Sequence, residues 1–141
     1  MRSVIIISIL FFFSIITAAQ DAVNIVDSKG RKQGIWKKYY ENGRLRYTGK
    51  FVDNIPVDTF RFYYPEGKLK AIKIHTGKNK RILVTMFYVD STLMAQGFYR
   101  DTIKDSTWKY YFSNGKLQSV EFYRKGMRNG VSKKYSSDGF L

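Results

Sequence analysis

The chain has 141 residues and no cysteine, which excludes a disulfide scaffold and a thiolate metal site. Its 25 lysine and arginine residues outnumber 11 acidic residues, and this net charge of +14 predicts attraction to anionic surfaces. The single histidine, His75, leaves little material for a histidine metal site or a Ser-His catalytic pair. An aromatic content of 17% with two prolines favours one β-sheet domain over disorder.

The first 19 residues have the pattern of a secretory signal peptide. An arginine precedes the apolar run 4–16, and small residues then lead to Ala19 and Gln20. A membrane anchor is the alternative, but this run as a helix spans about 20 Å, less than the roughly 30 Å of a hydrocarbon core. We therefore expect cleavage between Ala19 and Gln20 and an exported protein, periplasmic or secreted. Export argues against a nucleic-acid partner.

A repeat of 24 residues runs through the rest of the chain, which predicts one repeat domain over residues 20–141. Glycine stands two positions before the marker leucine in four of the repeats, and tyrosine stands six positions before it in four. The leucines that mark about 4.5 repeats are Leu45, Leu69, Leu93, Leu117 and Leu141.

Each repeat contains the signal of a β-hairpin. Asn-Gly, Glu-Gly or Asp-Gly pairs separate alternating runs in four repeats, and Asp90-Ser91 takes that place in the third. Type I′ turns need positive φ at both central residues, which suits these pairs. We expect two-residue turns that place Tyr40 opposite Leu45 and Trp36 opposite Gly49. The predicted fold is all-β, with stacked hairpins in an elongated, twisted, single-layer antiparallel sheet that follows an N-terminal signal helix.

This pairing places the large apolar side chains of all repeats on one face of the sheet. They are Trp36, Tyr40, Leu45, Tyr47, Phe51, Phe60, Phe62, Tyr64, Leu69, Ala71, Val84, Met86, Tyr88, Leu93, Ala95, Tyr99, Trp108, Tyr110, Phe112, Leu117 and Tyr123. We interpret them as core packing, since each buried ring contributes on the order of 2 kcal/mol. His75 occupies the position of Phe51 and Tyr99, and we interpret it as a packing substitute.

The opposite face carries basic residues beside tyrosines. The candidate partner-binding residues are Lys37, Tyr39, Arg61, Tyr63, Lys109, Tyr111, Lys133 and Tyr135. Equivalent side chains would lie roughly 10 Å apart, so the basic residues form a column that is interrupted at Thr85. Two interpretations stay open: a solvated face that discourages aggregation, and a binding strip for an anionic polymer or a partner protein.

The segment Gly30-Arg-Lys-Gln-Gly34-Ile-Trp36-Lys-Lys-Tyr-Tyr-Glu-Asn-Gly-Arg-Leu45 resembles the MORN repeat in its bacterial variant form. The resemblance covers about residues 27–141 and is closest to the YwqK-type antitoxins. It implies stacked hairpins and a scaffolding or partner-binding role, and it supplies no catalytic residue. Val84, Ser91 and Ser132 depart from the pattern, where an aromatic residue, a glycine and a tryptophan are expected.

Two functions follow as alternatives. The first is an exported, non-catalytic repeat scaffold that binds a protein or an anionic envelope polymer, with an anionic membrane surface as a further partner. The second is an antitoxin or immunity protein that neutralises a specific toxin, as the resemblance implies. No paired carboxylates, nucleophile motif or phosphate loop is present, and we expect no enzyme activity, cofactor or metal. Asp53 and Asp101 recur in connecting loops, where aspartate is common for turn geometry.

The third repeat is expected to be the weakest unit of the array. Ser91 takes the place of a turn glycine, and a residue other than glycine at positive φ costs about 1 kcal/mol. Val84 replaces a large ring, so this unit should bury less apolar area.

Overall fold

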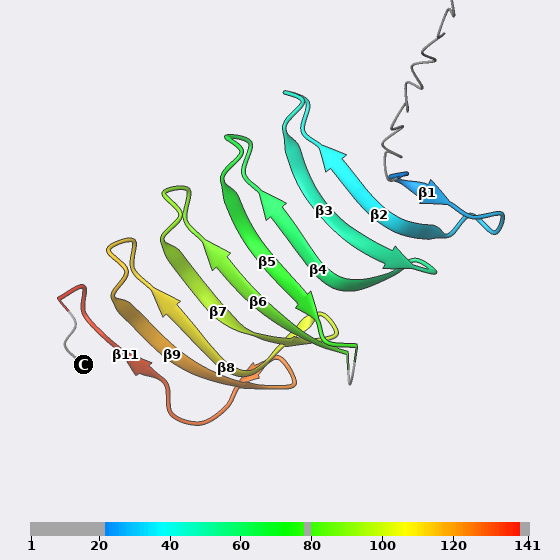
Figure 1. Ribbon diagram of the computed structural model, residues 1–141. Helices are drawn as coiled ribbons and strands as arrows, with labels where there is room; N and C mark the ends of the chain where they lie inside the picture. The colour runs from blue at the N-terminus through cyan, green and yellow to red at the C-terminus, as the bar shows by residue number, and fades with distance from the viewer. Residues whose placement is uncertain (1–21, 78–79, 139–141) are drawn as a thin grey trace, which may run out of the picture.

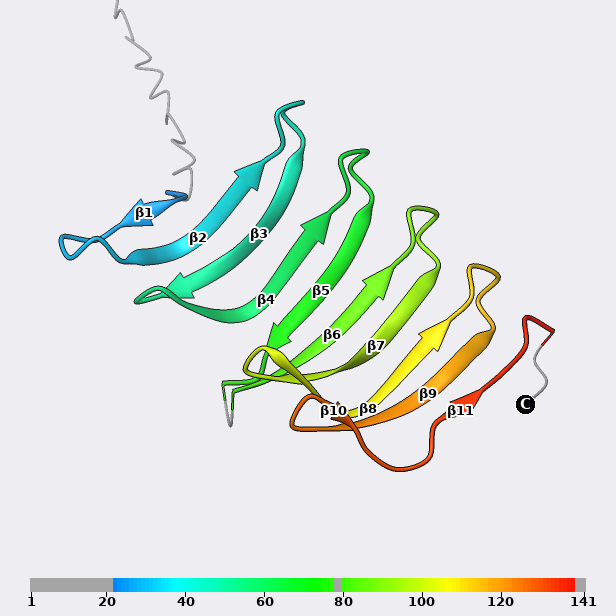
Figure 2. The ribbon, with the colours of Figure 1, turned by 180° about the vertical axis from the view of Figure 1, so that it is seen from behind.

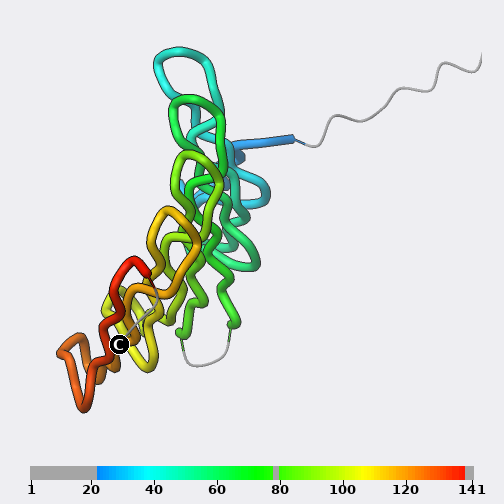
Figure 3. The backbone as a smooth tube through the Cα atoms, turned by 90° about the vertical axis from the view of Figure 1, so that its left-hand side faces the viewer, coloured from blue at the N-terminus to red at the C-terminus, as the bar shows by residue number. Residues whose placement is uncertain are grey.

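The chain folds as one open antiparallel sheet in the computed structural model, which describes residues 22–77 and 80–138. The strands pair in chain order from β1 to β10, and β11 also pairs with β9. Successive hairpins step along the sheet in Figure 1, and the view from behind in Figure 2 shows no second layer over either face. Seen from the side, the array is narrow and twisted (Figure 3). The predicted single-layer fold is confirmed, while the expected signal peptide of residues 1–19 lies outside the described residues.

Eleven strands make up the described part of the sheet. Their bounds are β1 (Ile25–Val26), β2 (Lys32–Tyr39), β3 (Leu45–Val52), β4 (Ile55–Tyr63), β5 (Leu69–His75), β6 (Arg81–Phe87), β7 (Leu93–Arg100), β8 (Ile103–Tyr111), β9 (Leu117–Arg124), β10 (Met127–Arg128) and β11 (Lys133–Lys134). Residues 22–77 and 80–138 contain no helix long and apolar enough to cross a membrane.

The apolar face predicted from the repeat is present, and we call it the ring face. Trp36 lies opposite Gly49, as expected, and its ring meets Phe51 edge-on with centroids 5.9 Å apart. Phe51 in turn meets Phe60 across the hairpin boundary at 5.1 Å. The buried apolar residues are Phe60, Ala71, Val84, Ala95 and Trp108, all on this face. Ring contacts between neighbouring hairpins therefore form the core of a sheet that has no second layer.

His75 belongs to the same packing. Its ring meets Phe60 edge-on with centroids 5.4 Å apart, which supports the interpretation of His75 as a packing substitute. Partial burial, helped by the nearby Lys73 ammonium, lowers the pKa of His75 below its usual value.

The hairpin turns differ from the predicted type I′ geometry. Gly43 N–H donates to the Tyr40 carbonyl at 3.0 Å, and Tyr40 N–H donates to the Arg44 carbonyl at 2.8 Å. Only the third loop residue, Gly43, has positive φ, at 77°, so this loop is a type I turn followed by a G1 bulge, and the loops with Gly67, Ser91 and Gly115 share this pattern. The extra loop residue shifts the pairing, and Tyr39 lies opposite Leu45, so the predicted Tyr40–Leu45 pair is wrong.

The asparagine of the turn does not adopt positive φ, so its role in the turn is a different one. Its side-chain oxygen receives a backbone N–H two residues later, as in Arg44 N–H to Asn42 Oδ1 at 3.1 Å. The third repeat keeps this bond with Asp90, whose Oδ1 accepts from Thr92 N–H at 2.8 Å. These backbone hydrogen bonds lower the pKa of Asp90.

Tyrosine hydroxyls join successive hairpins at the turn end of the sheet. Tyr40 Oη donates to the Tyr63 carbonyl at 2.7 Å, and Tyr64 Oη donates to the Phe87 carbonyl at 2.8 Å. Tyr88 Oη makes the same bond to the Tyr111 carbonyl at 2.8 Å. Because each bond runs from one repeat to the next, the tyrosines fix the spacing of neighbouring turns.

Val84, the residue at which the third repeat is expected to bury less apolar area, is completely buried. On the ring face, Phe60 and Trp108 each lie against a residue eleven positions earlier. That neighbour is Gly49 for Phe60 and Gly97 for Trp108, and a Cβ at either glycine would overlap the ring. Val84 lies opposite Lys73 instead, and the smaller side chain leaves room for the lysine. Valine in place of a large ring and lysine in place of glycine therefore compensate each other in size.

Candidate functional site

The basic column predicted from the sequence is a continuous cross-strand row, which we call the basic row. In antiparallel pairs, directly opposite residues share a face of the sheet, so the pairing identifies its members. In order across the sheet they are Lys37, Thr48, Arg61, Ile72, Thr85, Gln96, Lys109, Val120 and Lys133. Basic residues thus stand at every second strand except β6, where Thr85 interrupts them. We call this side of the sheet the basic face.

The four cations of the basic row are available to a partner. Arg61, Lys109 and Lys133 are exposed, and Lys37 is half-buried. No ion pair within residues 22–77 and 80–138 involves any of the four. Most acidic residues lie in turns and connections instead: Asp27, Glu41, Asp53, Glu66, Asp90, Asp101 and Asp138. The row therefore carries unneutralised positive charge.

The tyrosines predicted beside the row do not form one surface with it. Tyr39 is 51% exposed, whereas Tyr63 and Tyr111 are half-buried. Backbone carbonyls of Tyr63 and Tyr111 accept the hydroxyl bonds between hairpins, which is a structural role. Tyr135 lines a cavity together with Lys134, so its side chain lies apart from the basic row. The eight candidate residues thus divide into a basic row and a set of turn-flanking tyrosines.

Several lysines lie over rings of the ring face, and two of them, Lys32 and Lys104, hold equivalent positions three repeats apart. Lys32 Nζ is 4.8 Å from the Trp36 ring centroid, and Lys104 Nζ is 4.8 Å from that of Trp108. Lys104 also lies 4.9 Å from the Tyr123 ring and donates a hydrogen bond to Tyr110 Oη. Such cation–π contacts stabilise partly exposed rings by about 0.5–1 kcal/mol each.

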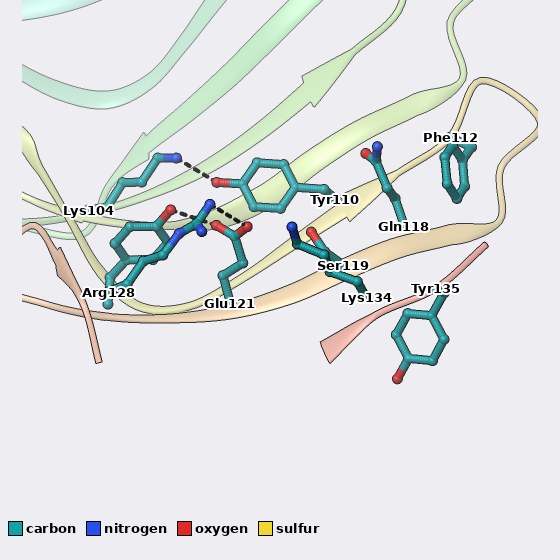
Figure 4. A pocket seen from close by; sticks show the side chains of 10 residues that line it. Lys104, Tyr110, Phe112, Gln118, Ser119, Glu121, Arg128, Lys134 and Tyr135 are labelled. Carbon is teal, nitrogen blue, oxygen red and sulfur yellow. Dashed lines mark hydrogen bonds and ion pairs between the residues drawn. The ribbon is translucent and has the colours of Figure 1, made fainter. Parts of the chain in front are cut away.

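A cavity of about 490 Å³ lies beside Lys104 on the ring face, between β8, β9, β10 and β11. Figure 4 shows its side chains, which come from these four strands and their ends. They are Lys104, Tyr110, Phe112, Gln118, Ser119, Glu121, Tyr123, Arg128, Lys134 and Tyr135. Sequence reasoning missed this cavity, although aligned repeats carry a signal: Ser119 stands where Ala71 and Ala95 stand in the preceding repeats.

The described residues contain no group of three histidine or acidic side chains gathered as a metal site. Asp53 and Asp101 lie in turns at positive φ, with values of 52° and 56°. Asp53 accepts a hydrogen bond from the Gln33 side chain, and Asp101 pairs with Lys80 at 3.5 Å. Both aspartates thus have structural roles in the connections.

A family model described as the MORN repeat variant matches residues 32–53, 59–74 and 104–125. These stretches contain the β2–β3 and β8–β9 hairpins and most of β4–β5, and the hairpin with Val84 and Ser91 lies between them. Searches of curated proteins and of solved structures each found no match. The match is to the repeat itself, and it supports neither the YwqK-type resemblance nor an antitoxin role.

Proposed function

Because the chain is a MORN repeat variant protein, we propose that it is an exported, non-catalytic scaffold whose basic row binds an extended anionic partner of the cell envelope. MORN repeats are in general scaffolds that bind proteins or membranes, so a surface along the array is the place to seek the contact. The proposal selects the basic face as that surface.

The spacing of the four unpaired cations supports the proposal most strongly. Equivalent residues lie two strands apart, so the charges of the row are roughly 10 Å apart, except for a gap of about 20 Å across Thr85, and the row is about 38 Å long from Lys37 to Lys133. A flexible polyanion can follow such a row and contact each cation in turn. A compact anion could contact only one of them.

The alternative is that the basic row is a solvated surface without a partner. Charged outer faces of this kind discourage the aggregation of sheets through their edges and faces. If the lysines served only to keep this face soluble, lysines paired with acidic residues would do so equally well. The four cations of the row have no ion-pair partner among the described residues, while most acidic residues lie in the turns, and this arrangement favours binding.

Export is part of the proposal and rests on the sequence of residues 1–19. Cleavage between Ala19 and Gln20 would release the repeat domain where polyanions of the envelope are present. Amino-terminal sequencing of the protein recovered from expressing cells tests this step. A chain that retains Met1 would contradict it.

The binding step can be tested with inorganic polyphosphate as the probe and neutral dextran as its control. Because exposed charges are screened over about 8 Å at physiological ionic strength, affinity for polyphosphate should fall steeply as salt rises. Dextran should not bind at any salt concentration. Absent polyphosphate binding, or binding that salt does not change, would overturn the proposal.

A further inference from the structure

The cavity between β8, β9, β10 and β11 has the size of a small-ligand site, at about 490 Å³. It lies on the ring face, so it is separate from the basic row. Its lining combines an acid, a serine hydroxyl, cations and rings, as Figure 4 shows. The repeat does not require this acid and this hydroxyl, because the preceding repeat holds Gly97 and Ala95 at the positions of Glu121 and Ser119.

Glu121 is the acidic centre of the cavity and is only 6% exposed. Tyr123 Oη donates to its Oε2 at 2.6 Å, and Arg128 Nη2 donates to its Oε1 at 2.8 Å. Each carboxylate oxygen can accept a second hydrogen bond, so Glu121 retains capacity for ligand hydroxyl groups. The corresponding residue of the preceding repeat is Gly97.

Ser119 lies beside Glu121 and is 7% exposed. Its hydroxyl has no hydrogen-bond partner among the described residues, although it borders the cavity. The hydroxyl can therefore donate a hydrogen bond to, or accept one from, a ligand group in the cavity. Alanine occupies the equivalent positions 71 and 95, so a hydroxyl is not needed there for folding.

The cavity carries an excess of positive charge. Lys104, Arg128 and Lys134 line it, against the single carboxylate of Glu121. Arg128 pairs with Glu121, and Lys104 bonds to Tyr110, which leaves the Lys134 ammonium without a partner among the described residues. The cavity therefore favours a ligand with one anionic group and disfavours a cation.

Aromatic rings supply the apolar part of the lining, from Tyr110, Phe112 and Tyr135. Burial, and the hydrogen bond with Tyr123, raise the pKa of Tyr110, so its hydroxyl stays protonated. Lys104 donates to Tyr110 Oη, and the Tyr110 proton can then be donated onward. Flat ring faces beside hydroxyl-bonding groups suit a ligand that has an apolar side and a polar rim.

The geometry points to a binding site for one acidic monosaccharide unit. A hexuronate combines the three required features: C–H groups for the rings, hydroxyls for Glu121 and Ser119, and a carboxylate for Lys134. A simple carboxylate lacks the hydroxyls, and a neutral hexose lacks the charge. The site is a second one, independent of the basic row.

D-glucuronate is the probe, titrated into the purified protein and followed by saturation-transfer NMR. Glucose carries the ring without the charge, and acetate carries the charge without the ring. We expect glucuronate to bind at least tenfold more tightly than either. Acetate that binds as tightly as glucuronate, or glucuronate that does not bind, would contradict the inference.

Two substitutions locate the site. Ser119→Ala installs the residue of repeats 2 and 3, and should weaken glucuronate binding about fivefold, which corresponds to one hydrogen bond of about 1 kcal/mol. Lys134→Gln should reduce the preference for glucuronate over glucose. Lys38→Gln is the matched control, because Lys38 holds the same position in the first repeat without a serine or an acid beside it.

Both variants should keep the parent melting temperature, and Lys38→Gln should bind as the parent does. Unchanged glucuronate affinity in Ser119→Ala and Lys134→Gln would place the sugar elsewhere and overturn the inference. Removing the cations of the basic row should leave glucuronate binding intact, so failure here is distinguishable from failure of the proposed function. Binding of an acidic peptide that displaces glucuronate and outcompetes it tenfold would also contradict a saccharide site.

Discussion

Gly97 lies against the face of the Trp108 indole, so that a Cβ at residue 97 would overlap the ring. Trp108 is 1% exposed, and its Nε1 donates to the Phe98 carbonyl at 2.9 Å, so the ring has little freedom to move away. We expect Gly97→Ala to destabilise the protein by about 1–3 kcal/mol, as overpacking of a core does. Denaturant unfolding measures the change, with the exposed neighbour Gln96→Ala as control. Equal stability of the two variants would contradict this packing.

Replacing Ser91 with glycine should raise the free energy of unfolding by roughly 0.5–1 kcal/mol. Ser91 has φ of 73° at the αL position of its turn, which glycine adopts without strain. Gly115→Ser should lower stability by a similar amount, because Gly115 has φ of 80°. Ser113→Gly, at a turn position without positive φ, should give no gain. A gain at residue 113 and none at residue 91 would refute the turn assignment.

The tyrosine bonds between hairpins should contribute measurably to stability. Tyr64→Phe removes the hydrogen bond to the Phe87 carbonyl, which should cost about 0.5–1.5 kcal/mol. Tyr39→Phe is the control, because Tyr39 is 51% exposed and its hydroxyl has no hydrogen-bond partner in residues 22–77 and 80–138. Urea melts of the two variants give the comparison. If both variants were as stable as the parent, the hydrogen bond of Tyr64 would have no stabilising role.

Stability should fall as pH decreases below about 6.5, because of His75. The folded state lowers the pKa of His75, so below 6.5 the unfolded chain takes up a proton that the folded protein resists. The loss should continue until pH reaches the lowered pKa, and stability should be flat above 6.5. His75→Phe, which installs the residue found at position 51, should abolish the change between pH 7.5 and 5.5. His75 is the only histidine, so an unchanged pH dependence in the variant would contradict the assignment.

The repeat pattern was sufficient to predict the architecture, the two faces and the basic row. Leucine spacing and turn glycines predicted hairpins, and side-chain alternation then determined which residues share a face. The turn type could not be predicted, because Asn-Gly suits both a type I′ turn and a type I turn with a G1 bulge. The structure was needed to show that the Asn42 side-chain oxygen accepts a hydrogen bond from the Arg44 backbone N–H.

The packing of Val84 and the cavity beside Glu121 required the structure. Val84 was predicted to weaken its repeat because sequence comparison within the chain does not show which residues touch. The structure shows that Val84 lies opposite Lys73, eleven positions earlier, and is completely buried, while the weakness of this repeat stays a prediction. Ser119 and Glu121 depart from the repeat pattern in the sequence, but their common cavity forms only where β10 and β11 fold beside β9.

Binding of polyphosphate by charge variants of the two faces tests the central claim most directly. One variant changes Lys37, Arg61, Lys109 and Lys133 to glutamine, and its matched control changes four exposed lysines away from the row: Lys29, Lys38, Lys68 and Lys125. Both lose the same charge, so a nonspecific effect of net charge should weaken them equally. We expect the row variant to lose at least tenfold more affinity than the control, and Thr85→Lys, which fills the gap in the row, to bind more tightly than the parent. Equal losses in the two variants would show that the basic row is only a solvated face.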